Sequence, residues 1–173
     1  MGLTIFGFLS AVPGYARDGI ALESGTGNHV EMARVSFNRE FDQVWFADRD
    51  WVVGSYLDGS IGQWHAHNAA GDDHVINDFS ITPVLRATER VRSAWAPYAE
   101  VGVGAHYISD HHIYRGRDMS THFQFGDHVG VGFSFGEQLA WDLGLRFQHI
   151  SNAGMKNPNP GINFYQVRAG YHF

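Results

Sequence analysis

Two side chains near the C-terminus, His149 and Ser151, have the types and the spacing that nucleophilic catalysis requires. Residues i and i+2 of a β-strand project from the same face of a sheet. An imidazole and a hydroxyl placed in this way can act as a general base and the nucleophile that it activates. A His-x-Ser pair also arises often by chance, so the rest of the chain has to decide between catalysis and two ordinary polar side chains.

The segments that must position this pair have the alternation of polar and apolar residues that is typical of β-strands. No long stretch with helical periodicity interrupts them. Turn signals such as Gly25-Thr26-Gly27-Asn28 separate neighbouring segments. The expected strands are 20–24, 30–37, 51–65, 75–87, 98–108, 121–135, 139–149 and 165–173.

The two faces of these strands differ in character. In 139–149 one parity carries Leu143, Leu145 and Phe147, whereas the other carries Asp142 and Arg146. Across the chain, charges recur at mid-strand on the second parity, at Arg86, Glu100, Asp142, Arg146 and Arg168. A soluble barrel with its apolar parity inward also explains the alternation. The chain, however, ends on an aromatic residue, Phe173, which resembles the C-terminal signature of bacterial outer-membrane barrels.

We therefore predict an all-β fold, an eight-stranded antiparallel transmembrane β-barrel with a packed polar interior. Several segments approach the 9–11 residues that a tilted strand needs to cross a bilayer. The apolar parity must then face lipid, because the bilayer core solvates no charges. Eight strands leave an interior that side chains can fill, so no wide pore is expected.

The composition excludes several other classes of protein. A length of 173 residues fits one domain. The formal charge of -6 and the lack of Lys/Arg clusters argue against binding to nucleic acid. The chain has no cysteine, which excludes disulfides and thiolate metal sites, and its eleven His show no compact ligand spacing. We expect no metal and no cofactor.

The N-terminal residues 1–16 form an apolar run that ends in Pro13-Gly14-Tyr15-Ala16. This pattern predicts a secretory signal peptide, followed by an outer-membrane barrel at 17–173. The run is shorter than the roughly 20 apolar residues of a membrane-spanning helix. A positively charged segment is missing before it, which suggests that the true start lies upstream; a short N-terminal strand or helix is the alternative.

On this fold His149 continues the lipid-facing parity of Leu145 and Phe147, and Ser151 follows it at the end of the strand. A polar pair on the outside of the barrel is placed for a substrate that is itself a membrane lipid. Polar residues at strand ends also occur simply because they lie in the headgroup zone, which is the competing interpretation.

The segment around the pair resembles the signature of the lipid A 3-O-deacylase family (PagL). The residues that carry this resemblance are His149-Ile150-Ser151-Asn152-Ala153-Gly154, Lys156, Pro158-Asn159 and Gly161-Ile162. The resemblance implies an eight-stranded outer-membrane barrel that hydrolyses the ester-linked acyl chain at the 3 position of lipid A. It further implies that Ser151 is the nucleophile, that His149 is the general base, and that Asn152 and the backbone N–H of Gly154 form the oxyanion hole. Pro158, Pro160 and Gly161 are expected only to shape the loop.

The chain departs from the family pattern at Asn163, where the characterised enzymes of the family place a Glu. Asn163 can accept a hydrogen bond from the imidazole but brings no charge, so it is expected to stabilise the imidazolium less. A second carboxylate, Asp127, has the lipid-facing parity of a strand that should neighbour His149. We expect Asp127 either to polarise the groove and contact substrate or to mark a strand bend beside Gly126.

The leading hypothesis is thus an outer-membrane esterase that acts on lipid A or lipopolysaccharide. A non-catalytic barrel that lost turnover at Asn163 is the first alternative, and another barrel lipid enzyme, a phospholipase or an acyltransferase, is the second. The sequence leaves open whether the protein forms a homo-oligomer.

Overall fold

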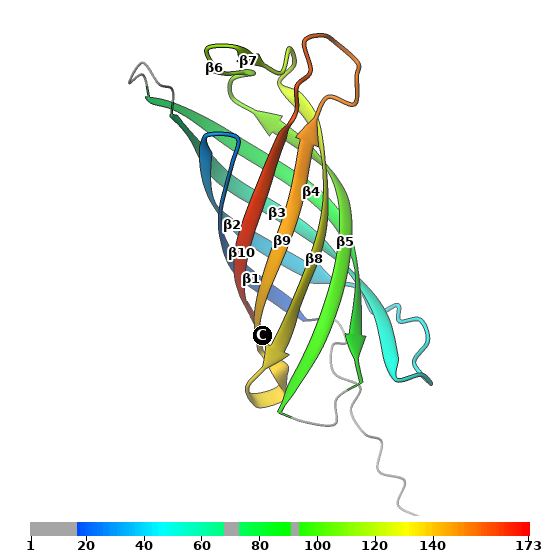
Figure 1. The fold of residues 1–173 in the computed structure, drawn as a ribbon. Helices are drawn as coiled ribbons and strands as arrows, with labels where there is room; N and C mark the ends of the chain where they lie inside the picture. Colours follow the sequence, from blue (N-terminus) through cyan, green and yellow to red (C-terminus); the bar gives the residue numbers. More distant parts are fainter. Residues whose placement is uncertain (1–16, 68–72, 91–93) are drawn as a thin grey trace, which may run out of the picture.

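The computed structural model of the protein describes residues 17–67, 73–90 and 94–173. The predicted signal peptide at 1–16 lies outside these residues. Eight long strands form one closed antiparallel barrel in the order β1-β10-β9-β8-β5-β4-β3-β2, as Figure 1 shows. Their bounds are β1 Asp18–Gly27, β2 Val30–Glu40, β3 Trp51–His67, β4 Asp73–Glu89, β5 Trp95–Ile108, β8 Phe123–Phe135, β9 Trp141–Ser151 and β10 Ile162–His172.

Three short elements complete the described fold. The strands β6 (His112–Tyr114) and β7 (Arg117–Asp118) form a small hairpin in the connection between β5 and β8. The 3-10 turn η1 (Glu137–Leu139) joins β8 to β9. In Figure 1 the β6–β7 hairpin and the β9–β10 loop lie at one end of the barrel, here called the loop end, and the C-terminus lies towards the other, the terminus end. In the part of the chain that the structure describes, no helix is long and apolar enough to cross a membrane.

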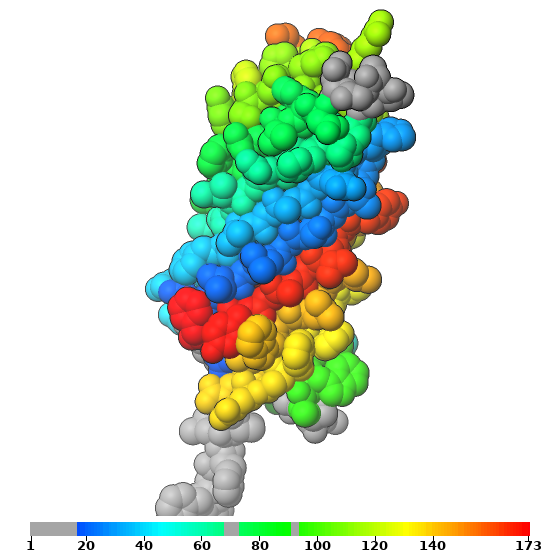
Figure 2. Space-filling model, turned by 90° about the vertical axis from the view of Figure 1, so that its left-hand side faces the viewer, coloured from blue at the N-terminus to red at the C-terminus, as the bar shows by residue number. Residues whose placement is uncertain are grey.

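Exposure alternates along the strands as the sequence parity predicts. Along β9 the apolar side chains of Leu143, Leu145 and Phe147 are exposed, whereas Asp142 and Arg146 are buried. The same pattern holds in β8 and β10. Figure 2 shows the tilted strands wrapping the outside as diagonal bands. The predicted eight-stranded barrel, with its apolar parity outward, is therefore confirmed.

Two belts of aromatic side chains enclose an aliphatic zone on the outer surface. At the terminus end, adjacent strands place Trp95 beside Phe135, Phe135 beside Trp141, and Trp141 beside Tyr171. Towards the loop end the exposed aromatics are Phe79, Tyr107, Phe123, Phe125, Phe147 and Tyr165. Valines and leucines fill the surface between, for example Val101, Val129 and Leu145. Aromatic girdles that flank an apolar band are typical of transmembrane barrels, because amphipathic rings favour the membrane–water interface.

The interior of the barrel is held by ion pairs, as the mid-strand charges predict. The guanidinium of Arg146 donates to Glu100 at 2.6 Å, to Glu23 at 2.7 Å and to the Tyr56 hydroxyl at 2.8 Å. The guanidinium of Arg168 donates to Asp142. All five charged groups are almost completely buried. Because each charge has several partners, the desolvation cost of burying it is offset within the network.

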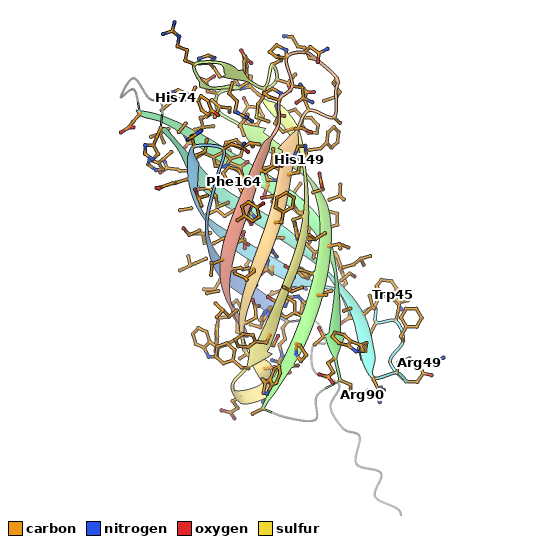
Figure 3. The ribbon with its side chains drawn as sticks, in the orientation of Figure 1. Trp45, Arg49, His74, Arg90, His149 and Phe164 are labelled. Carbon is orange, nitrogen blue, oxygen red and sulfur yellow. The ribbon has the colours of Figure 1, made fainter. Side chains whose placement is uncertain are left out.

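The loop end of the interior differs from the rest, because it is apolar. Trp64 and Phe164 pack there with ring centroids 5.3 Å apart, and Ile150 and Ile162 are completely buried beside them. Figure 3 shows Phe164 inside the barrel, below the loops. Sequence parity predicted a polar lumen and did not distinguish this zone. It matters for function because Ile150 and Ile162 anchor the strand ends that carry the candidate site.

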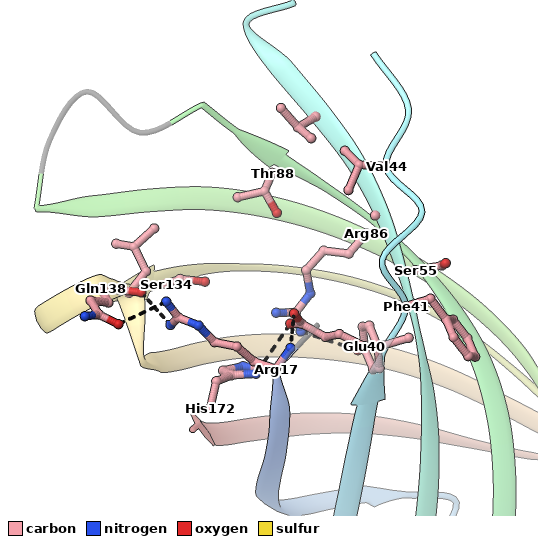
Figure 4. A pocket seen from close by; sticks show the side chains of 14 residues that line it. Arg17, Glu40, Phe41, Val44, Ser55, Arg86, Thr88, Ser134, Gln138 and His172 are labelled. Atoms are coloured by element: carbon pink, nitrogen blue, oxygen red, sulfur yellow. Dashed lines mark hydrogen bonds and ion pairs between the residues drawn. The ribbon is translucent and has the colours of Figure 1, made fainter. Parts of the chain in front are cut away.

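At the terminus end a cavity of about 80 Å³ opens into the barrel (Figure 4). The backbone N–H of Arg17 donates to Glu40 at 3.2 Å, and its guanidinium donates to the carbonyl of Gln138 at 2.8 Å. Glu40 also lies 3.6 Å from Nδ1 of His172. These residues span the mouth, and the cavity lies at the opposite end of the barrel from His149.

Candidate active site

His149 and Ser151 lie at the loop end of β9, and both point outward from the barrel. Figure 3 places His149 high on this strand. Both side chains are half-buried, whereas Ile150 between them is completely buried in the apolar cluster. The predicted shared face of the pair is therefore present, and the packing of Ile150 fixes the strand segment that carries it.

The imidazole of His149 is oriented by Asn163 of β10. The two residues are direct partners across the strands, and Nδ1 of His149 lies 2.6 Å from Oδ1 of Asn163. Because a carbonyl oxygen only accepts hydrogen bonds, Nδ1 carries the hydrogen and Nε2 keeps its free lone pair. A base that must take a proton from a hydroxyl needs this tautomer.

Asn163 is itself held by the β1–β2 turn. Its backbone N–H donates to the side-chain oxygen of Asn28 at 2.8 Å. Gly27 allows this approach, because a Cβ at that position would lie only 1.7 Å from the carbonyl oxygen of Asn163. The sequence marked Gly27 and Asn28 only as a turn; nothing in their spacing indicated that the turn supports the partner of His149.

Asp127 of β8 flanks His149 on its other side. The two residues are register partners, and the Asp127 side chain is exposed on the outer surface, as its parity predicted. Among the described residues it makes no hydrogen bond or ion pair. His149 thus lies between an amide on β10 and a carboxylate on β8.

Asn152 begins the loop that follows β9 and is completely buried. Its side-chain nitrogen donates to the carbonyl oxygens of Met119 at 2.9 Å and Lys156 at 2.8 Å. Its backbone N–H donates to Oδ1 of Asn159 at 3.0 Å. Gly154 is exposed, with φ +77°, and the turn is closed by a hydrogen bond from the N–H of Met155 to the carbonyl of Asn152. Both predicted oxyanion-hole residues thus lie in the turn directly after Ser151.

The carboxylate of Asp118 organises the neighbouring β6–β7 hairpin. It accepts a hydrogen bond from the backbone N–H of Ser120 at 2.6 Å and lies 2.8 Å from Nδ1 of His111. The Ser120 N–H, followed by His111, holds the pKa of Asp118 below its usual value. No group of three or more His, Asp or Glu among the described residues has an arrangement that could hold a metal ion.

The barrel and this site agree with what comparison with known proteins shows. The model of the family described as lipid A 3-O-deacylase (PagL) matches residues 31–172. The chain belongs to this family. A lipid A deacylase PagL of Bordetella bronchiseptica is 33% identical over 158 residues, which cover 90% of this chain and 83% of that protein. A lipid A deacylase PagL of Pseudomonas aeruginosa is 26% identical over 152 residues, which cover 88% of this chain and 84% of that one.

A solved structure supports the fold independently. The crystal structure of the outer membrane enzyme PagL superposes with a TM-score of 0.77 at 22% sequence identity, and covers 88% of this chain and 98% of the other. The family and the belted barrel together place the protein in the bacterial outer membrane. The loop end then faces the cell exterior, because barrels of this type carry their longer loops outside and their short turns in the periplasm.

Proposed function

We propose that this protein is an outer-membrane esterase that hydrolyses the ester-linked acyl chain at the 3 position of lipid A. One observation carries the proposal: the oriented His149, with Ser151 beside it on the strand, faces the membrane next to the loop-end aromatic belt. Phe147 precedes His149 on the outer face of β9, and Ser151 is the register partner of Phe125. Acyl chains of a membrane glycolipid can lie against the aliphatic zone while the ester stays at the level of the pair.

The first half of the reaction forms an acyl-enzyme. Oγ of Ser151 attacks the ester carbonyl carbon while Nε2 of His149 takes the hydroxyl proton. The tetrahedral intermediate collapses, the bond from carbon to the sugar oxygen breaks, and the imidazolium returns its proton to that oxygen. The 3-hydroxyl of the sugar is thereby set free, and the acyl chain stays on Ser151.

The second half regenerates the enzyme with water. His149 takes a proton from water, which attacks the acyl carbon, and the bond to Oγ breaks as Ser151 regains its proton. The products are a free fatty acid and the 3-O-deacylated lipid. One water is consumed for each ester, so the reaction needs no further reactant.

The negative charge of the intermediate requires hydrogen-bond donors, and we assign these to Gly154 and Asn152. The backbone N–H of Gly154 lies in an exposed turn with positive φ, three residues after Ser151. The Asn152 amide can take part if it exchanges one of its two carbonyl partners, Met119 or Lys156, for the oxyanion. One such donor is typically worth about 10²–10³ in kcat.

Asn163 orients the base in this mechanism, and Asp127 supplies the nearest charge. Asn163 fixes the tautomer of His149 but leaves the imidazolium without a carboxylate partner. Asp127, on the opposite side of His149, stabilises the positive ring during turnover or contacts the polar part of the substrate. With an amide on one side of His149 and a carboxylate on the other, the site can activate Ser151 without the Glu of the family pattern.

Mass spectrometry of lipid A from cells that express the protein tests the function. The proposal expects loss of one 3-hydroxyacyl chain, abolished by Ser151→Ala and His149→Gln. Unchanged lipid A would indicate a non-catalytic barrel instead. A gain of acyl mass would indicate an acyltransferase, and deacylated phospholipid a phospholipase.

Under the same proposal residues 1–16 are a signal peptide, which predicts that N-terminal sequencing of the protein from outer membranes begins near Arg17. Self-association is tested separately by crosslinking in the native membrane, which detects a dimer.

A further inference from the structure

The β6–β7 hairpin and the two residues that follow it, Met119 and Ser120, contact the β9–β10 loop at several points. Ser120 Oγ donates to the carbonyl of Pro158 at 2.7 Å, and the carbonyl of Met119 accepts from Asn152 at 2.9 Å. Arg117 adds a third contact, from its guanidinium to the carbonyl oxygen of Gly161. The hairpin region thus holds the β9–β10 loop near its start, in its middle and at its end.

The hairpin is itself anchored by buried side chains, so it can hold the β9–β10 loop in place. Ile113 and Met119 are completely buried in the apolar cluster at the loop end of the barrel. The guanidinium of Arg117 lies 5.8 Å from the ring centroid of Tyr114, and its Nε donates to the Tyr114 hydroxyl at 2.8 Å. Cation–π contact and hydrogen bond together restrict Arg117 to one direction, towards Gly161.

Gly161 connects this contact to the base. Its φ is +61°, and a Cβ built on it would lie 2.6 Å from Cε1 and 3.2 Å from Nε2 of His149. The backbone of Gly161 therefore forms a wall against the edge of the imidazole that must exchange protons, while Asn163 holds the opposite nitrogen.

We propose that Arg117 is a positioning residue for catalysis: it fixes the carbonyl of Gly161, and Gly161 in turn fixes the imidazole of His149. The role of this contact in turnover rests on the proposed function, but the contact itself does not. Arg117 acts on the base through the loop backbone and does not contact the ester. Without Arg117 the backbone of Gly161 is no longer held against the ring. The hydrogen bond to Asn163 then remains as the contact that orients the imidazole, and the ring can tilt away from Ser151.

The matched variants are Arg117→Ala and Arg115→Ala. Arg115 lies in the same hairpin, is exposed, and makes no hydrogen bond or ion pair among the described residues, so its removal changes the local charge equally. The first readout is the ¹³C–¹H signal of the His149 ε1 position in detergent micelles, assigned by its loss in His149→Gln. Arg117→Ala should shift or broaden this signal, and Arg115→Ala should leave it in place.

Kinetics on lipid A supply the second readout. Arg117→Ala should lower kcat by about 10- to 100-fold with little change in KM, because misplacement of a catalytic group costs rate rather than uniform binding. Arg117→Lys, which keeps one donor, should recover part of kcat. Gly161→Ala, which pushes a methyl group into the ring, should reproduce both effects without any change of charge.

Two results would overturn the proposal. One is an unchanged His149 signal in Arg117→Ala, in protein whose gel mobility still differs between heated and unheated samples, as expected of a folded barrel. The other is a raised KM with unchanged kcat, which would make Arg117 a substrate-binding residue. If the parent protein does not deacylate lipid A, the proposed function fails, but the His149 signal still decides whether Arg117 positions the ring.

Discussion

At the residue scale, the site has an oriented base whose hydrogen-bond partner carries no charge. Asn163 accepts the hydrogen bond of His149 Nδ1 at 2.6 Å, so the geometry of a triad is present without its carboxylate. In serine hydrolases the third residue both holds the tautomer and stabilises the imidazolium. In the function proposed above these two roles are divided: Asn163 orients the ring, and Asp127 on the neighbouring strand supplies the charge.

Asn163→Glu is expected to restore both roles to one residue. A carboxylate beside Nδ1 stabilises the imidazolium form, so kcat should rise by about tenfold. Initial rates on detergent-solubilised lipid A measure this change; an unchanged kcat would mean that Asn163 does not face the base in turnover.

Asp127→Asn tests whether Asp127 supplies the charge that Asn163 lacks. Loss of the nearest carboxylate should lower kcat/KM by several-fold, on the order of 1 kcal/mol in the barrier. Glu89→Gln is the control, because Glu89 is also an exposed carboxylate but lies at the terminus end of β4. If activity survives Asp127→Asn unchanged, the residue only marks a strand bend.

At the element scale, the loops at the loop end depend on one another. The β1–β2 turn holds Asn163, the β6–β7 hairpin holds the β9–β10 loop, and Asp118 holds the hairpin. Buried isoleucines tie these segments to the barrel. The strand ends that carry the site are therefore fixed from the inside by apolar packing and from above by hydrogen bonds.

The hairpin should loosen in acid through Asp118. The pKa of Asp118 is lowered in the folded protein by the Ser120 N–H and by His111. The charged carboxylate therefore stabilises the hairpin fully above the unfolded pKa of about 3.9, and this stabilisation is lost as the pH falls through the lower folded pKa. Hydrogen exchange of the Ser120 amide should accelerate over that range, relative to an exposed reference amide. In Asp118→Asn the exchange should be faster already at neutral pH, and this extra acid dependence should disappear.

At the scale of the whole molecule, a buried charge network joins the strands across the interior of the barrel. Arg146 alone joins Glu100, Glu23 and Tyr56, which come from three different strands. In contrast, the pair between Arg39 and Asp18 lies at the surface, with 65% of the Arg39 side chain exposed. The two arginines form ion pairs of nearly equal length, 2.7 Å and 2.8 Å, at opposite extremes of burial.

Arg146→Ala is expected to destabilise the barrel by about 3–5 kcal/mol, because it leaves two buried carboxylates short of a partner. Arg39→Ala should cost about 1 kcal/mol or less, because water replaces an exposed partner. Urea unfolding in micelles, followed by tryptophan fluorescence, compares the two free energies. Equal losses would show that burial does not amplify the Arg146 interactions.

The barrel, its orientation to lipid and the outward face of His149, Ser151 and Asp127 could all be predicted from the amino-acid sequence. Strand parity is a local property with a period of two residues, so alternation in one segment separates its two faces. The charges at mid-strand and the C-terminal Phe173 then indicated that the apolar face meets lipid. The family signature near Ser151 is equally local, and it pointed to the same residues. The expected strands were recovered because each could be identified without knowing its neighbours.

The surroundings of His149, in contrast, became visible only in the folded chain. Asn28, Arg117 and Gly161 lie far from one another in the chain, and they meet at the site because closure of the barrel places β1, β10 and the β6–β7 hairpin at the same end. The apolar cluster around Trp64 and Phe164 also depends on side chains from many strands. Pairing register and loop packing depend on contacts across the whole fold, which no single segment encodes. The pair His149 and Ser151 could therefore be predicted from its strand parity and the family signature around it, but the contacts that hold His149 in place could not.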